Sequence, residues 1–553
     1  MNSLISRIRH ASYTEANSTI RNICGIVEYF SSEDEKEEFI STYESIGPVV
    51  NEDRISYGDW QTPRPLADAV CKKHIAKYGN PDILIEPTCG LGSFVFSALD
   101  LFPNLTEIHA LEINRQYIDE LKFKILSNAL NHPSSKRCEI YIYNADFFVF
   151  DFSPIIKKAK NNNWNLAVIG NPPWVTNSRQ GRNNSRNIPV KHNSYGLKGI
   201  DAITGKSNFD ISEYITLHLL GLSQLNKGGI SFLLKNSVIR NILSKQKSHP
   251  LDIGRIEQEM IDASSEFNVS VDASCFSAQF ACEPSLSCSL KDFYTGHTIR
   301  EYGWINDSFV SDIDKYRQYS AYDNCSAYIW RSGIKHDCAS VLELTLADGK
   351  YFNGRGEEIQ IEDDLIYPLL KSSDIGKYET NKFRKYIIVP QHKVDEDTSL
   401  LRITHPRAYS YLTNHAEAFS KRKSCIYNGK GAFSIFGVGD YSFKPYKIVV
   451  SALYKDIRFV VISPSEGKPV MIDDTCYQLD FDSKEEALAI YDALNSVEIQ
   501  SLLKSLIFTD AKRVITKNLL MRLDLVQACK IKGIILNSDR INHYSDRQLS
   551  LFD

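Results

Sequence analysis

The four residues Asn171-Pro172-Pro173-Trp174 directly follow the apolar run 165–170, and their types suit the binding of a planar amine. Each proline fixes its backbone φ angle and lacks an N–H donor. The carbonyl of Pro172 and the side chain of Asn171 are therefore left as hydrogen-bond acceptors, while Trp174 offers a flat aromatic face. Two acceptors beside a stacking surface suit a ring with an exocyclic amino group. The alternative is a proline-rich turn with a buried Trp174, which the position after a fourth predicted strand disfavours.

A glycine-containing turn follows an earlier apolar run. The run 83–86 ends in Glu86, and Gly90 and Gly92 precede a helix predicted to begin near Ser93. Glycine allows a ligand close to the backbone, and the first turn of a helix has free N–H donors. The two glycines fall short of the three-glycine dinucleotide fingerprint, so a phosphate cradle is less well supported. An ordinary strand–turn–helix corner remains the alternative.

Two more apolar runs end in acidic residues. Glu112 ends the run 108–112, and a carboxylate at about this distance from the glycines can accept from both ribose hydroxyls. After the run 139–144, Asp146 is placed to accept from an adenine amino group while Phe147 packs on its ring. The carboxyl ends of parallel strands meet at one sheet edge, so these acids predict a single crevice that suits a cationic ligand.

The surrounding pattern predicts the elements that hold these residues. Between residues 56 and 290, short apolar runs alternate with amphipathic helical stretches, which predicts an α/β fold with a Rossmann-like doubly wound sheet. Residues 1–55 have helical spacing and are predicted to form a short helical N-terminal segment. From 291 to 553, strand-like runs mix with aromatic, glycine and basic residues, and helical stretches come near the end. This part is predicted to be a separate mixed α+β domain.

Composition limits the classes of protein that remain. The chain has 553 residues, of which 43% are hydrophobic and 24% charged, as in a globular protein. Its formal net charge of −4 argues against a globally basic nucleic-acid coat, although a local basic face stays possible. The first residues lack the apolar core of a secretory signal, and no apolar run reaches the length of a membrane span. Cytoplasmic localisation is expected. The 12 cysteines include no C-x-x-C pair, so no metal site is predicted.

Two local basic stretches predict contact with nucleic acid. Residues 178–206 contain six basic residues against one acid and follow the Asn-Pro-Pro-Trp sequence, which favours a phosphate clamp over a solvated loop. Residues 371–447 contain fourteen Lys or Arg against seven Asp or Glu. The predicted DNA-binding residues are Arg179, Arg182, Arg186, Lys191, Lys421, Arg422 and Lys423.

In this order the motifs resemble those of the gamma-order N6-adenine DNA methyltransferases associated with restriction–modification. QTPRPLADAV (61–70) is similar to their N-terminal cofactor motif. EPTCGLGSF (86–94), ALEIN (110–114) and NADFF (144–148) are similar to their three S-adenosylmethionine motifs, and NPPW (171–174) to their catalytic motif. The resemblance covers about residues 56 to 525, with a C-terminal part similar to the family's target-recognition domain. It departs at Trp174, where the family more often has Tyr or Phe.

The resemblance implies a role for each matching residue. S-adenosylmethionine would be held at its methionine end by Thr62 and Pro63, at its ammonium by Glu86, at its ribose by Glu112 and at its adenine by Asp146 and Phe147. The turn that contributes Pro87, Gly90 and Gly92 would complete this cofactor site. The target base would be held by Asn171, Pro172, Pro173 and Trp174.

The implied activity is that of a site-specific adenine-specific DNA methyltransferase. It would transfer a methyl group to N6 of an adenine flipped out of double-stranded DNA, as the modification enzyme of a restriction–modification system whose endonuclease is on a separate chain. The same two-acceptor corner fits an N4-cytosine methyltransferase or, with the second half unexplained, a glutamine side-chain methyltransferase. A DNA-binding scaffold with a non-catalytic cofactor site is the alternative from another class.

Overall fold

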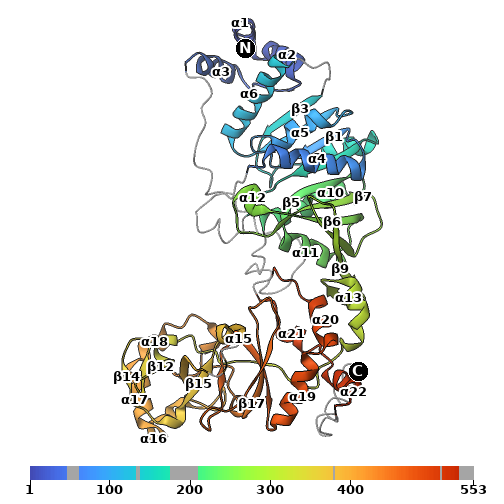
Figure 1. Ribbon diagram of the computed structural model, residues 1–553. Helices are drawn as coiled ribbons and strands as arrows, with labels where there is room; N and C mark the ends of the chain where they lie inside the picture. The colour runs from blue at the N-terminus through green and yellow to red at the C-terminus, as the bar shows by residue number, and fades with distance from the viewer. Residues whose placement is uncertain are drawn as a thin grey trace. The chain divides into compact units, whose positions relative to one another are not determined.

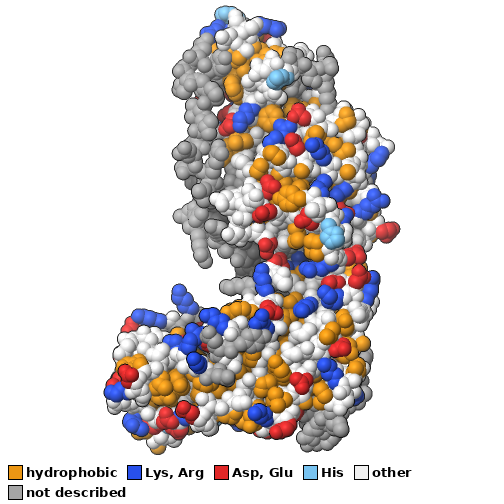
Figure 2. Space-filling view, viewed as in Figure 1, with side chains coloured by type: hydrophobic (Ala, Val, Ile, Leu, Met, Phe, Trp, Pro, Cys, Tyr) orange, Lys and Arg blue, Asp and Glu red, His pale blue; other side chains and the backbone are white. Residues whose placement is uncertain are grey.

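The computed structural model describes residues 1–45, 61–132, 138–174, 210–377, 380, 382–510 and 513–534. The chain divides into two compact units, Met1–Phe309 and Val310–Asp553, called unit 1 and unit 2 below. In Figure 1, the colour runs from blue to green through unit 1 and from yellow-green to red through unit 2. Charged and apolar side chains are interspersed over the face that Figure 2 shows. Within the described ranges, no helix has both the length and the apolar composition to cross a membrane.

Unit 1 is built on one ten-stranded sheet with the order β10-β9-β8-β6-β7-β5-β4-β1-β2-β3. The strands from β5 to β3 in this order are all parallel to their neighbours, and β7 runs antiparallel to β5. The parallel strands are β1 (Ile83–Glu86), β2 (Glu107–Glu112), β3 (Glu139–Asn144), β4 (Asn165–Gly170) and β5 (Lys227–Lys235). Since helices connect them, the predicted α/β fold with a Rossmann-like doubly wound sheet is confirmed.

The helices of unit 1 cover this sheet in packed groups. Helix α4 packs on α5, and α10 packs on both α7 and α11. Their bounds are α4 (Arg64–Tyr78), α5 (Ser93–Leu101), α6 (Arg115–Asn131), α7 (Ser153–Asn161), α10 (Ile211–Ser223), α11 (Asn236–Lys245) and α12 (Ala263–Phe267).

The strand order creates one edge where functional side chains meet. The central strand β1 lies between β4 and β2, with Ile83 opposite Leu166 on one side and Glu107 on the other. The order reverses between β4 and β1, and such a switch point is where open α/β sheets bind ligands. Glu86 ends β1 and Asn171 directly follows β4, so the topology brings both to this edge.

Unit 1 extends past residue 290, where the sequence composition changes. Strand β8 (Ser287–Asp292) pairs in parallel with β6 (Ile253–Ile261), and β9 (Thr298–Ile305) pairs antiparallel with β8. Strands β7 (Ala273–Phe280) and β10 (Ser308–Val310) complete the sheet. Unit 1 ends at Phe309, and the predicted boundary of the catalytic domain at residue 290 stays a prediction. Strand β9 is largely exposed at its start, which explains its more polar composition.

The N-terminal helices belong to the core of unit 1. Helices α1 (Asn2–Ile8), α2 (Tyr13–Cys24) and α3 (Glu33–Ser45) match the helical segment predicted within residues 1–55, but they form no separate unit. Residues Leu4, Ile8 and Ile20 lie in the same apolar cluster as Leu121 of α6. Ile26 also pairs with Ile140 of β3, which covers that edge of the sheet.

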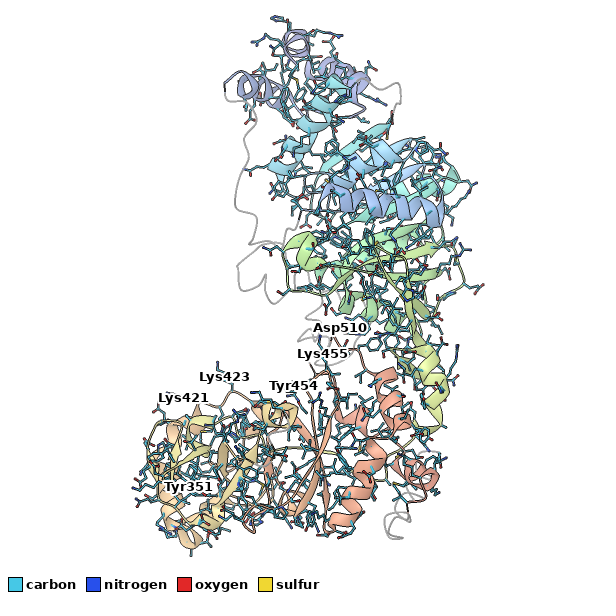
Figure 3. The ribbon with its side chains drawn as sticks, in the orientation of Figure 1. Tyr351, Lys421, Lys423, Tyr454, Lys455 and Asp510 are labelled. Atoms are coloured by element: carbon cyan, nitrogen blue, oxygen red, sulfur yellow. The ribbon has the colours of Figure 1, made fainter. Side chains whose placement is uncertain are left out.

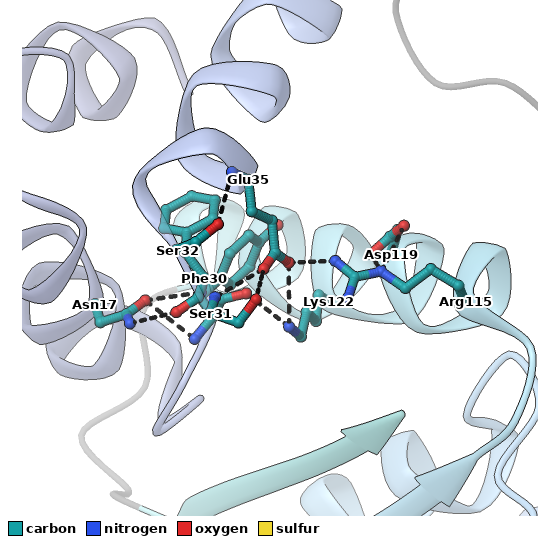
Figure 4. A network of polar contacts seen from close by, with 9 residues as sticks. Asn17, Phe30, Ser31, Ser32, Glu35, Arg115, Asp119 and Lys122 are labelled. Atoms are coloured by element: carbon teal, nitrogen blue, oxygen red, sulfur yellow. Dashed lines mark hydrogen bonds and ion pairs between the residues drawn. The ribbon is translucent and has the colours of Figure 1, made fainter. Parts of the chain in front are cut away.

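A polar network fastens these helices to α6 (Figure 4). The Glu35 carboxylate accepts from the backbone N–H of Ser31 at 2.7 Å and forms an ion pair with Arg115 of α6. The buried Lys122 donates to the carbonyl of Tyr29 at 2.6 Å and lies 3.8 Å from Glu35. Burial lowers the pKa of Lys122. The network ties Tyr29, which precedes α3, and Glu35, in the first turn of α3, to helix α6.

Unit 2 combines two sheets with helices, as the mixed α+β prediction expected. A four-stranded sheet has the order β11-β20-β17-β18, and a six-stranded sheet has the order β14-β13-β12-β16-β15-β19. The strands are β11 (Arg331–Ser332), β12 (Glu343–Ala347), β13 (Lys350–Asn353), β14 (Glu358–Ile359), β15 (Ile366–Leu370), β16 (Lys385–Ile388), β17 (Tyr446–Ser451), β18 (Phe459–Ile462), β19 (Met471–Ile472) and β20 (Cys476–Phe481). The helices are α13 (Ile313–Tyr319), α14 (Ala339–Leu342), α15 (Ser372–Lys377), α16 (Leu401–Thr404), α17 (Pro406–Asn414), α18 (Ala416–Ser420), α19 (Lys484–Leu494), α20 (Val497–Leu506), α21 (Lys517–Leu520) and α22 (Leu525–Ile531).

A buried lysine lies in the central strand pair of the smaller sheet. Lys447 of β17 is 1% exposed, and its Nζ donates to the carbonyl of Lys444 at 2.8 Å. Desolvation lowers its pKa from 10.5 to about 7, against the opposing attraction of Asp480. A buried amine whose pKa is depressed destabilises the folded state wherever the unfolded chain is protonated.

We predict that Lys447→Met raises the melting temperature, with the largest gain below about pH 7. The free-energy cost of burying the charged amine is largest below the pKa of Lys447 in the folded protein. This cost disappears as pH rises toward the pKa of the same group in the unfolded chain. The gain should therefore shrink between about pH 7 and pH 10. Thermal unfolding of both proteins across this range provides the measurement. Lys444→Met is the control, because the Lys444 amine is partly exposed and pairs with Asp482. An equal gain at every pH would contradict the prediction.

Candidate active site

A small hollow opens at the switch point of the unit 1 sheet. Four residues predicted from the sequence line it, namely Thr62, Glu86, Gly90 and Asn171. They come from three separate segments, which precede α4, follow β1 and follow β4. The structure thus places two predicted residues at one hollow. They are Glu86, whose carboxyl group is predicted to bind the cofactor, and Asn171, the predicted acceptor for the amine.

Glu86 is the most unusual side chain of this hollow. It is 2% exposed, and its Oε2 has no hydrogen-bond partner among the residues that the structure describes. Burial raises the pKa of Glu86 well above its usual value, and the charge of Glu112 raises it further, while a backbone hydrogen bond from Val95 acts in the opposite direction. A bound cation would supply the missing partner and favour the carboxylate.

The turn after β1 depends on its two glycines. Gly90 and Gly92 have φ angles of +51° and +82°, in the left-handed region that favours glycine. A Cβ atom on Gly90 would lie 2.8 Å from the Gln61 amide, and one on Gly92 would lie 2.3 Å from Leu121. The turn therefore brings its backbone close to the segment before α4 and to helix α6. Pro87, also predicted to line the cofactor site, is buried between Glu86 and this turn.

Glu112 holds the turn from the neighbouring strand. Its Oε2 accepts from the backbone N–H of Gly90 at 2.9 Å, and its Oε1 accepts from that of Asn114 at 2.8 Å. Asn114 is also the N-cap of α6, where its side chain accepts from Gln116. The carboxylate links the ends of β1 and β2 to the start of α6. Its contact with a ribose stays a prediction.

Asp146 and Phe147 lie outside the lining of this hollow. The Oδ1 of Asp146 accepts from the backbone N–H of Phe148 at 3.0 Å. The buried Phe147 ring contacts Phe152 and His218, with centroids at 5.4 and 5.7 Å. In this structure the ring packs between α7 and α10, so its predicted contact with an adenine ring stays a prediction.

The Asn-Pro-Pro-Trp corner combines a pocket residue with a core residue. The Nδ2 of Asn171 donates to the hydroxyl of Thr62 at 3.3 Å. Trp174 is 6% exposed, donates to the carbonyl of Leu233 at 3.1 Å and meets the ring of Phe267 edge to face at 5.3 Å. The indole therefore packs in the core, as the alternative interpretation of this sequence expected, while Asn171 lines the hollow.

Other residues at this site were not predicted from the sequence. Ser93 donates to the carbonyl of Thr62 at 2.6 Å, and the backbone N–H of Leu91 donates to Gln61 at 3.1 Å. These bonds hold the segment before α4, where Thr62 and Pro63 lie, against the glycine turn. The remaining unpredicted lining residues are Thr88, Cys89 and Phe94. The only sequence signal for them was their position inside motifs already singled out.

The predicted DNA-binding residues divide into three groups. Arg179, Arg182, Arg186 and Lys191 lie outside the described residues. Arg422 donates to the carbonyls of Phe419, Ser434 and Ala432, and its guanidinium carbon lies 3.7 Å from the centroid of the Tyr427 ring. It holds its own segment together, so the interpretation of Arg422 as a DNA contact is not favoured. Lys421 pairs with Glu417, and Lys423 is exposed.

The fold and the position of the hollow define a Rossmann-like α/β protein with a candidate ligand site at the switch point. No family model matches the chain. Over 485 residues, which are 87% of this chain and 99% of the relative, it is 39% identical to the type II methyltransferase M.NspV of Nostoc sp. (strain ATCC 29411 / PCC 7524). The chain therefore belongs to the type II methyltransferase family of restriction–modification systems.

Solved structures also match this chain at low identity. The type IIL restriction–modification enzyme MmeI in complex with DNA is 11% identical, with a TM-score of 0.46 over 96% of this chain and 77% of that chain. A type I methyltransferase subunit from Streptococcus thermophilus is 13% identical, with a TM-score of 0.31 over 53% of this chain and 67% of that chain. The family assignment rests on the relative from Nostoc.

We predict that Gly92→Ala destabilises unit 1 more than Gly296→Ala does. Both glycines have positive φ angles, so both substitutions carry backbone strain of about 1 kcal/mol. Only at position 92 would the new Cβ also overlap a buried neighbour, Leu121, which adds about 1–3 kcal/mol. Melting temperatures of the two variants measure the difference. Equal losses would show that the turn has more room than the structure indicates.

Proposed function

We propose that this protein transfers a methyl group from S-adenosylmethionine to N6 of an adenine in duplex DNA. The observation that carries the proposal is that Glu86, with its unsatisfied buried oxygen, and Asn171 line the same hollow. A carboxyl group for the ammonium of the cofactor and an acceptor for the amine of the base, at one sheet edge, suit methyl transfer from a sulfonium to an amine. Membership of the type II methyltransferase family supports the same conclusion.

The residues present fit this cofactor. Glu86 would neutralise its ammonium group, beside Thr62 and Pro63 at the methionine end. The fixed turn at Gly90 and the carboxylate of Glu112 would hold the ribose, and Asp146 and Phe147 would adjust to hold the adenine. When bound, the cofactor supplies a methyl group on a positively charged sulfur. All other features of the mechanism come from the protein.

Asn171 would hold the amine of the target base. The hydrogen bond to Thr62 turns Nδ2 toward that hydroxyl, so Oδ1 is the atom that serves as acceptor. Together with the Pro172 carbonyl, it would accept from the N6–H groups and stabilise the positive charge that develops on N6. No strong base is then needed, because the proton can leave after transfer. Alignment of N6 with the methyl group would contribute up to about 7–11 kcal/mol.

Base flipping would require the packing around Trp174 to change. Adenine N6 is inaccessible in a duplex, so the base must leave the stack at a cost of a few kcal/mol. The Trp174–Phe267 pair provides two aromatic rings beside the Asn-Pro-Pro corner. Stacking against an aromatic side chain recovers about 1–3 kcal/mol. Because Trp174 is buried, we infer that the edge contact with Phe267 opens when the base enters.

N4-cytosine methylation is the second candidate. The same acceptors fit the amino group of cytosine, so the geometry is compatible with either base. The resemblance of NPPW and its neighbouring motifs to the N6-adenine group favours adenine. Sequencing of DNA from cells that express the protein, with a readout of both modified bases, distinguishes the two. A cognate restriction endonuclease on a separate chain would recognise the same DNA sequence.

We predict that Asn171→Ala abolishes methyl transfer and leaves cofactor binding within a few fold of the wild type. The substitution removes the acceptor for the amine but leaves Glu86 in place. Transfer of labelled methyl groups to DNA and calorimetric titration with the cofactor measure the two effects. Thr62→Ser is the matched control, because it keeps the hydroxyl that orients Asn171. Turnover close to wild type in Asn171→Ala would remove this residue from the mechanism.

We predict that cofactor binding releases a proton from Glu86. Burial raises the pKa of this carboxyl in the free protein, and a cationic ligand favours the carboxylate, so binding should lower the pKa and release a proton from the protonated fraction. Affinity should therefore rise with pH until the pKa of the free protein is passed. Titrations at pH 7 in two buffers with different ionisation enthalpies measure the release. Glu86→Gln should bind more weakly and release no proton from this position, and equal release by both proteins would contradict the assignment.

A further inference from the structure

The connection between β17 and β18 exposes an apolar and aromatic tip in unit 2. Between the buried residues Ala452 and Ile457, four consecutive residues are exposed. Leu453 is 38% and Tyr454 is 36% exposed, and Lys455 follows them. These two adjacent apolar side chains are partly exposed and are therefore available for contact with a partner.

The tip is held firmly at its base. The backbone N–H of Ala452 donates to Thr475 at 2.9 Å, and its carbonyl accepts from Val514 at 3.0 Å. The Tyr454 ring lies against Gly376 of α15, where an added Cβ would be 2.4 Å from the ring. Helix α15 is itself tied to β17 by the hydroxyls of Ser372 and Ser451. The exposed ring is therefore presented in a fixed position, which reduces the entropy cost of binding.

The charges around the tip indicate the chemistry of the partner. Among the described residues, exposed Lys455 and Lys423 form no ion pair, whereas Lys421 pairs with Glu417. Lys421, Lys423, Tyr454 and Lys455 all project from the same side of unit 2 in Figure 3. The unpaired ammonium group of Lys455 follows the partly exposed Tyr454 ring, and Arg458 pairs with the neighbouring carboxylate of Asp456. This combination suits a polyanion with apolar ring edges, as in DNA.

We propose that the tip Leu453–Lys455 contacts the duplex DNA substrate, with Lys455 at a phosphate and Tyr454 at the edges of bases. This inference rests on the proposed function and adds the element that sets sequence preference. Phosphate contacts fix the position of a protein on DNA, and contacts with base edges distinguish sequences. Because Tyr454 is held against α15, it can favour some base pairs over others by shape and by contact with thymine methyl groups.

The phosphate contact is tested with Lys455→Gln. Binding of the full-length protein to a DNA duplex that contains the sequence it methylates is measured at several salt concentrations. Loss of one phosphate contact should weaken binding and reduce the slope of log affinity against log salt by about 1. Lys484→Gln on α19, another exposed lysine of unit 2, should leave the slope unchanged. A slope for Lys455→Gln equal to that of the wild type overturns this contact.

The base contact is tested with Tyr454→Ala and Leu453→Ser. Genomes of cells that express each protein are sequenced for modified bases and their sequence context. At one or more positions of the methylated DNA sequence, the preference for one base over the others should fall by about tenfold or more. Leu453→Ser retains the ring on α15 and serves as the readout if Tyr454→Ala has a lower melting temperature. An unchanged context in the folded variants overturns the inference alone, whereas absence of DNA methylation by the wild type overturns the proposed function and this inference with it.

Discussion

Burial of a carboxyl group at the end of a central strand is the constraint on which unit 1 depends. Glu86 lies at the end of β1, where neighbouring strands on both sides exclude water. An ionisable group in such a place costs free energy unless it is paired or neutral. Burial raises the pKa of Glu86 and so disfavours its charged form in the free protein. The proposed cationic ligand would offset this cost by pairing with the carboxylate.

The other residues at this edge of the sheet hold the carboxyl of Glu86 and the side chain of Asn171 in fixed positions. Glu112 fixes the backbone of Gly90, and the segment that contains Thr62 bonds to both the glycine turn and Asn171. Through Asn114, the same edge continues into α6, which the N-terminal helices cover. A short segment before α4 thus joins the proposed cofactor and base sites, and the N-terminal helices support the helix beside them.

Unit 2 shows why a high density of basic residues does not by itself identify a binding surface. Arg422 lies in the densest basic run, yet its guanidinium is used by three backbone carbonyls and an aromatic ring. Lys447 of the same basic region is buried in a sheet. The cations that remain for a partner are those whose packing leaves them exposed, such as Lys423 and Lys455.

The sequence by itself determined the strands of unit 1, the acidic residues at their ends and the turn at Gly90 and Gly92, because apolar periodicity and glycine conformations are local properties. It also indicated that Glu86 and Asn171 meet, since parallel strands share an edge. Only the tertiary structure decided the partners of individual side chains. The bond between Thr62 and Asn171, the burial of Trp174 and the extension of the sheet to Val310 all depend on contacts between distant segments. Such contacts follow from the packing of whole elements, which no local pattern records.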